Sequence, residues 1–204
     1  MGSRRLGRKR LHSIEKLGKS LTATEIGIGA GMEPALVRAT QKRDGLLVLT
    51  EIVLNLGTSK GVVACSANNA AIGVQGADST IFQYTQAVFG RLLEIEVVCI
   101  EQPAGAAAVA DDLELHQHTE AINAGAALKG VAQLVLAGDG EYVAGDVASV
   151  AVTSLSSLGE SYTASPFFAL AQGEASHDGA AETYTAGKFV IRITGQADPL
   201  NSDI

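Results

Sequence analysis

The chain of 204 residues contains no tryptophan, only nine Phe and Tyr residues, and two cysteines. With so few aromatic side chains, its 47% apolar content comes mostly from Ala, Val, Leu and Ile. Two cysteines in a chain of this length do not make a disulfide framework. Cys65 and Cys99 both lie in apolar runs, which is typical of buried free thiols. A single disulfide between them is the alternative.

Long apolar runs are also missing. No run approaches the ~18 uninterrupted apolar residues of a membrane-spanning helix. The N-terminus is charged and lacks the apolar segment and small-residue cleavage site of a signal peptide. We therefore expect a soluble protein, made in a reducing cytoplasm, with no membrane partner.

Motifs of known enzymes are absent as well. The sequence has neither a Gly-x-Ser-x-Gly nucleophile motif nor a Walker phosphate-binding loop. Gly27, Gly29 and Gly31 superficially match a nucleotide-binding loop, but that motif needs a strand directly before it and a helix directly after it. Residues 20–35 are therefore interpreted as a Gly-rich linker. We expect no enzymatic activity and no cofactor.

One pair of histidines suggests a metal. If residues 111–118 form a strand, His116 and His118 share one face of it and lie close to acidic residues. This arrangement looks like part of the metal site of a cupin-type jelly-roll enzyme. Such a site needs a further ligand from a distant strand, and His12 and His177 are the other histidines. The preferred interpretation is that both histidines face solvent on the polar side of a strand.

The 23 glycines, the many β-branched residues and the low charged content of 18% favour short strands over long helices. Roughly eight to ten strands with turns between them predict an all-β, antiparallel β-sandwich that is jelly-roll-like. A short helix is permitted at residues 119–130, although Gly125 weakens it. The predicted strands are residues 62–66, 80–89, 91–103, 111–118, 147–155, 167–172 and 187–196. Residues 46–57 are predicted to be a strand pair or one long strand with a bulge, and residues 133–143 a strand, a tight Gly-Asp-Gly turn and a return strand.

Two segments, residues 91–103 and 187–196, show the clearest alternation of apolar and polar side chains. One buried and one partly wet face indicate an antiparallel sheet. Pro103 is predicted to end the first strand, because proline cannot donate to the ladder. The side chains predicted to share the apolar faces are Leu93, Ile95, Val97, Cys99, Phe189, Ile191 and Ile193.

Charge is distributed unevenly along the chain. Residues 1–19, called the arm below, carry seven of the fifteen Lys and Arg residues and one of the twenty-two acidic residues, which gives +6. The remaining eight bases and twenty-one acids give residues 20–204 a charge of −13. Such a split adds nothing to a core and is typical of a segment that contacts a partner. Residues 1–44 are thus predicted to be an N-terminal arm and linker, and residues 45–204 the β-sandwich body.

The arm combines bases with apolar side chains. Leu11, Ile14 and Leu17 recur every three residues, which permits a short helix that orders only against a partner or the protein's own body. The arm has no aromatic residue for stacking on bases, so a protein surface is preferred over nucleic acid or a merely solvated terminus. The predicted partner-binding residues are Arg4, Arg5, Leu6, Arg8, Lys9, Arg10, Leu11, Ile14, Lys16, Leu17 and Lys19.

Three passages resemble segments of small virion structural proteins of tailed bacteriophages. They are R-R-L-G-R-K-R-L at 4–11, R-D-G-L-L-V-L-T-E-I-V-L-N-L-G-T-S-K-G-V-V at 43–63 and T-A-G-K-F-V-I-R-I-T-G at 185–195. Within that group the chain most resembles head decoration, or cement, proteins. The resemblance implies a jelly-roll or β-sandwich body, an N-terminal extension that grips the capsid lattice, and a homotrimer or dimer.

The expected function is therefore that of a non-enzymatic phage capsid decoration protein. Its partners would be the major capsid protein and other copies of itself. It would be located on the capsid exterior of the virion after synthesis in the host cytoplasm. The alternatives are a tail or head–tail connector protein, and a metal-dependent cupin-like jelly-roll enzyme that uses His116 and His118.

Overall fold

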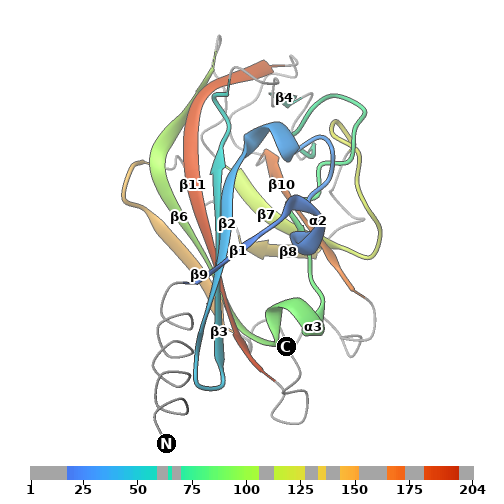
Figure 1. Cartoon of the computed structure of the whole chain (residues 1–204). Coiled ribbons are helices and arrows are strands. Elements are labelled where there is room, and N and C mark those ends of the chain that lie inside the picture. The colour runs from blue at the N-terminus through green and yellow to red at the C-terminus, as the bar shows by residue number, and fades with distance from the viewer. Residues whose placement is uncertain are drawn as a thin grey trace, which may run out of the picture.

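The computed structural model describes residues 18–58, 64–65, 70–105, 113–126, 133–136, 143–151, 165–172 and 182–197. These residues form two antiparallel sheets that lie against each other as a sandwich (Figure 1), which confirms the predicted all-β fold class. The large sheet has the order β1-β2-β3-β11-β6-β9, and β4 pairs with β11 outside this order. The small sheet has the order β5-β10-β7-β8.

The strands of the large sheet are β1 (Lys19–Leu21), β2 (Leu36–Asp44), β3 (Leu47–Asn55), β4 (Ala64–Cys65), β6 (Arg91–Gly105), β9 (Val147–Ala151) and β11 (Glu182–Gln196). Those of the small sheet are β5 (Phe82–Gln83), β7 (Leu113–His118), β8 (Gln133–Leu136) and β10 (Phe167–Gln172). The helical elements are α2 (Ala23–Ile26), the 3-10 helix η1 (Glu33–Ala35) and α3 (Gln86–Phe89).

Eight of the strands follow the winding of a jelly roll. β3 pairs with β11, β5 with β10, β6 with β9, and β7 with β8. The first of these strands therefore pairs with the last and the second with the second last, as in one long hairpin. Pairing of β11 with β6 and of β10 with β7 rolls this hairpin into two sheets of four strands. Alternation in the sequence indicates strands but not this order.

The core lies between the two sheets and largely follows the predicted alternation. On β11, Phe189, Ile191 and Ile193 are buried, while Arg192 is exposed. On β6 the inward residues Ile95, Val97 and Cys99 are also buried, as predicted.

Leu93 departs from this alternation, because Leu92 is buried in its place. The register shifts here, with Thr194 opposite Glu94 and Gly195 opposite Leu92. The extra residue of this β-bulge reverses the face on which the next side chain lies.

Aromatic side chains fill the space between the sheets at one end of the sandwich. Phe82 stacks on Phe168 with ring centroids 4.3 Å apart, and Phe89 lies 5.6 Å from Phe82. The hydroxyl of Tyr84 donates to the Gly90 carbonyl at 2.7 Å, so its polar end is satisfied inside the core.

Pro103 does not end its strand, contrary to the prediction. β6 continues to Gly105, and its register with β11 shifts twice in this region, between Tyr184 and Lys188. Proline is tolerated here because the ladder is interrupted, so its missing N–H removes no regular bond. Gly187 fits the same irregularity, since its φ is 123° and a Cβ there would lie 3.1 Å from the Cα of Pro103.

The predicted strand at residues 80–89 is also wrong beyond Gln83. The carbonyl of Thr85 accepts from the amides of Val88 and Phe89 at 3.2 and 2.9 Å, which forms α3. This turn places Phe89 in the core against Tyr84, so two aromatic residues that strict alternation assigns to opposite faces are both buried. The helix predicted at 119–130 is not found within its described residues, 119–126, where Asn123 instead forms a bridge to Asp78.

Residues 20–35 are part of the body, so their interpretation as a linker was wrong. A capping box between Thr22 and Glu25 begins α2, and Ile26 and Met32 are fully buried. Small residues serve close packing here, because a Cβ on Gly31 would lie 2.7 Å from the carbonyl oxygen of Asp78.

The body also begins earlier in the chain than residue 45. β2 pairs with β3 from Leu36 to Asp44, so the predicted boundary after residue 44 falls inside a β-hairpin. β1 adds to this sheet from Lys19. The arm therefore overlaps the body at Lys19, which the charge pattern alone does not indicate.

Replacing Phe82 with Ala should destabilise the fold by about 3–5 kcal/mol, because it removes a fully buried ring and leaves a cavity. Chemical denaturation measures the difference. Val147→Ala on an exposed position of β9 is the matched control and should change stability by less than about 0.5 kcal/mol. Equal effects of the two substitutions would contradict this description of the core.

Candidate interaction surface on the large sheet

The outer face of the large sheet, which is the face turned away from the small sheet, is crossed by rows of side chains. The rows arise because β3, β11, β6 and β9 pair in continuous register, so residues directly opposite one another point to the same side. Three successive rows are Val53, Val190, Val98 and Val147; Glu51, Arg192 and Glu96; and Leu49, Thr194 and Glu94.

The valine row makes the centre of this face apolar. Val53, Val98 and Val190 are at most 9% exposed and form a cluster of their own, separate from the main core. Val147 continues the row on β9 and is 58% exposed. The apolar area that this row exposes therefore comes mainly from Val147.

The charged row is held together by ion pairs. Arg192 Nη1 donates to Glu96 Oε1 at 2.6 Å, and Arg192 Nε lies 3.7 Å from Glu51 Oε2. Arg38 Nη2 extends the row from β2 to Glu51 Oε1 at 3.0 Å. The hydrogen bond to Glu96 is the main reason why the pKa of Arg192 is raised. These side chains are partly exposed, so each pair contributes about 0–1 kcal/mol to stability.

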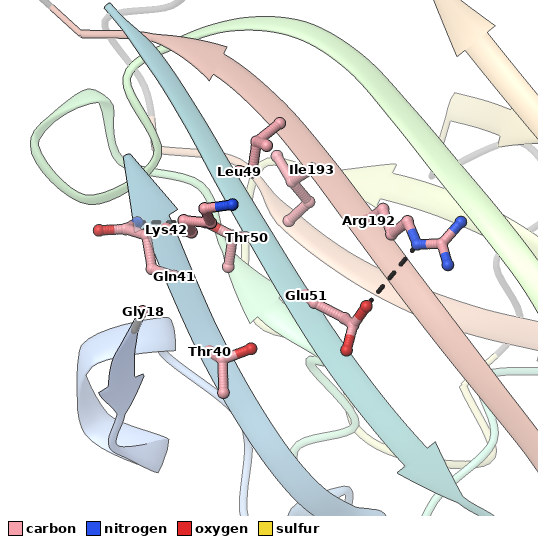
Figure 2. A pocket seen from close by; sticks show the side chains of 9 residues that line it. All are labelled: Gly18, Thr40, Gln41, Lys42, Leu49, Thr50, Glu51, Arg192 and Ile193. Atoms are coloured by element: carbon pink, nitrogen blue, oxygen red, sulfur yellow. Dashed lines mark hydrogen bonds and ion pairs between the residues drawn. The ribbon is translucent and has the colours of Figure 1, made fainter. Parts of the chain in front are cut away.

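A groove lies beside this ionic row. It has a volume of about 360 Å³ and is lined by residues of β2, β3 and β11 together with Gly18. Figure 2 shows Glu51 and Arg192 reaching toward each other from neighbouring strands, with Gly18 at the β2 side of the groove. Leu49 contributes apolar surface and is 40% exposed.

The position of Gly18 follows from β1. Lys19 pairs with Gln41 and Leu21 with Ala39, so β1 is an edge strand against β2. The buried side chain of Leu21 fixes this strand to the core. The arm therefore joins the body at the border of the groove.

Among the predicted partner-binding residues, the structure describes Lys19. It is exposed, and its Nζ contacts Glu25 Oε1 at 2.6 Å. Glu25 also accepts from the backbone amide of Thr22 at 2.8 Å. The hydrogen bond from Lys19, followed by those from Thr22, lowers the pKa of Glu25 to about 2. Arg4, Arg5, Leu6, Arg8, Lys9, Arg10, Leu11, Ile14, Lys16 and Leu17 lie outside the described residues.

The two candidate metal ligands on β7 have different partners. His116 is 6% exposed, and its Nε2 lies 2.9 Å from Glu114 Oε2. His118 Nδ1 instead accepts from the backbone amide of Glu120 at 3.0 Å. Within the described part of the chain, no group of three or more His, Cys, Asp or Glu side chains could hold a metal. His12 and His177 lie outside that part.

His116 also departs from the preferred interpretation of a solvent-facing pair, because it is buried. Its Nδ1 has no hydrogen-bond partner among the residues that the structure describes. The alternation of residues 111–118 correctly places Leu113 and Leu115 in the core. Alternation within this strand cannot show whether other segments cover its opposite face. The buried cluster of Ala71, Ile122 and Ala171 shows that such a cover exists.

The Cys99 thiol is buried and free. Its Sγ donates to the Glu101 carbonyl at 3.4 Å. Burial, with a smaller contribution from Asp146, raises the pKa of Cys99 to about 11. The predicted role of a small hydrophobic side chain is confirmed for Cys99, whereas the side chain of Cys65 lies outside the described residues.

The residues that form the groove and the ionic row were not identified from the sequence. One available signal was Arg192, a single base between the buried residues Ile191 and Ile193. Its partners Glu51 and Glu96 lie on β3 and β6, so finding them requires the register of β11 with both strands.

Across its described residues, the chain has no helix that is both long and apolar enough to cross a membrane. Comparison of the chain with protein-family models, with curated proteins and with solved structures finds no match. The functional argument therefore depends on the chain's own charge pattern and on the geometry of this face.

The titration of Glu25 provides a test of the contact that joins the arm to the body. Its folded pKa of about 2 is below the ordinary 4.5. The stability that this carboxylate contributes should therefore be fully present above pH 4.5 and be lost as the pH falls through about 2. Carboxyl NMR should show the low pKa, and Lys19→Gln should raise it. Titration of Glu25 near 4.5 in the unaltered protein would show that the contact is absent in solution.

Proposed function

We propose that this protein is a structural component of a bacteriophage virion that decorates the outside of the head, with the arm as its anchor on the major capsid protein. The observation that carries the proposal is the charge split, +6 in residues 1–19 against −13 in residues 20–204. A segment with this charge and with four aliphatic side chains suits an acidic, partly apolar surface on another protein. The resemblance to cement proteins supports the same function.

The position of the arm supports this proposal. The arm continues from β1, which lies at the edge of the large sheet. Jelly-roll bodies occur in viral capsid proteins and also in lectins and cupins, so the fold is compatible with this function without selecting it.

The acidic body has a physical role in such a protein. Copies with strong like charge repel one another and stay dispersed before a shell is present. Once the arm binds, repetition across the lattice adds many modest contacts together. Self-association as a trimer or dimer on the shell is part of the proposal and derives from the resemblance.

The two alternatives differ in what supports them. A tail or head–tail connector protein would use the same arm, so particle position and copy number distinguish it from a head protein. A metal-dependent enzyme would need a third ligand for His116 and His118, which at present contact Glu114 and the Glu120 backbone, respectively.

The test is binding to undecorated heads assembled from the major capsid protein of the same virus. Full-length protein should co-sediment with these heads at high copy number and appear on their outer surface in electron micrographs. A variant that lacks residues 1–17 retains Lys19 and its contact with Glu25. It should fold normally but lose at least about a hundredfold in affinity, because several charge-assisted contacts are removed together.

A body variant controls for loss of charge alone. Arg91→Gln removes an exposed base from β6, outside both the arm and the groove, and should leave head binding unchanged. Undiminished decoration by the truncated protein would exclude the arm as the anchor. Low-copy rings at one vertex or on tails would instead identify a connector or tail protein.

A further inference from the structure

We infer that residues 11–17 of the arm dock into the groove on the outer face of their own chain when the protein is free. This goes beyond the proposed function, because it concerns the isolated protein and requires no capsid. It identifies an occupant for a surface that the fold leaves open.

The first argument is where the arm joins the body. Gly18 lines the groove, and pairing of Lys19 with Gln41 fixes the position of the neighbouring residue. Leu17 is therefore one Cα–Cα step, about 3.8 Å, from the groove border. Ile14 is three residues further and can lie at most ~11 Å beyond Leu17. Both side chains can reach the groove without any intervening linker.

The second argument is chemical complementarity. Leu49 in the groove and Leu47 at the start of the same strand are 40% and 41% exposed, so each has apolar area left to bury. Leu11, Ile14 and Leu17 supply matching aliphatic groups from the arm. Burial of such area is favourable at about 25 cal/mol per Å² in general.

The charges of the arm and of the sheet beside the groove are also complementary. Glu94 lies in the row that contains Leu49 and Thr194, and its carboxylate is in no ion pair with another described residue. By contrast, Glu51 and Glu96 already contact Arg192. Lys16 precedes Leu17 in the arm, so a base accompanies the aliphatic side chains to this row.

The size of the groove agrees with this occupant. Its 360 Å³ is more than twice the ~150 Å³ of an engineered cavity that holds one benzene molecule. Two aliphatic side chains fit that space. Because the arm is tethered, docking is an intramolecular step with a high effective concentration, and modest contacts suffice.

A second copy of the protein is a less favourable source for the same segment. Its arm would carry the same side chains, but it would lose translational and rotational freedom on binding. The body charge of −13 on each copy also opposes the approach of two bodies. Intramolecular docking avoids both costs.

The experiment is limited trypsin digestion of the full-length protein, because six Lys and Arg residues lie within residues 4–16. Mass spectrometry follows the rate at which the intact N-terminus is lost. L49S should raise that rate by about threefold or more, since it removes an aliphatic side chain from the groove. V147S is the matched control on the same face, at a position 58% exposed, and should leave the rate unchanged.

A double-mutant cycle tests whether the two surfaces meet. I14S alone should accelerate cleavage as L49S does, and the combined variant should be no faster than either, because groups in contact are not additive. Equal cleavage of wild-type, L49S and I14S proteins would overturn the inference. So would fully additive effects.

Dilution distinguishes the two sources of the arm. The wild-type cleavage rate should not change on a dilution of about a hundredfold, because intramolecular docking is independent of concentration. A rate that rises on dilution would place the arm in the groove of another copy and overturn the inference. None of these outcomes bears on head binding, so the proposed function is tested separately.

Discussion

The pairing of β11 with both β3 and β6 is the constraint on which the rest of the structure depends. β11 is the last of the eight jelly-roll strands in the chain, yet it lies between the first and the third of them in the large sheet. Its register directs Phe189, Ile191 and Ile193 into the core and Arg192 to the outer face. A slip by one residue would exchange these faces and bury a guanidinium, so the core and the outer face specify the same register.

The sequence predicted the strands that have one buried and one partly wet face. β6, β7 and β11 were predicted because polarity alternates along each of them with a period of two. The order of the strands could not be predicted in this way, since alternation contains no information about which strands are neighbours. Leu93 and Pro103 were misassigned for a related reason: their places are set by irregularities in the pairing of β6 with β11.

Glycine-rich composition misled the prediction for residues 20–35. A glycine-rich composition suits both a flexible linker and a tightly packed connection. Only the segment of the fold that packs against these residues distinguishes the two. Here the partner is the segment around Asp78, which accepts from the Gly31 amide at 2.6 Å. The charge pattern marks the arm in the sequence, and the role of the arm stays a prediction. The groove beside it could not be predicted, because Leu49 and Arg192 are far apart in sequence and come together only through the sheet.

The outer face differs from the rest of the body in its charge balance. Among the described residues its rows contain five bases, Arg38, Lys42, Arg91, Lys188 and Arg192, and five acids, Asp44, Glu51, Glu94, Glu96 and Glu101. Among the described residues the charges of this face therefore balance, whereas residues 20–204 as a whole carry −13. If the arm docks as inferred and anchors the protein as proposed, the capsid surface competes with the groove for the arm. The apparent affinity of the protein for the capsid is then lowered by the fraction of arms already docked.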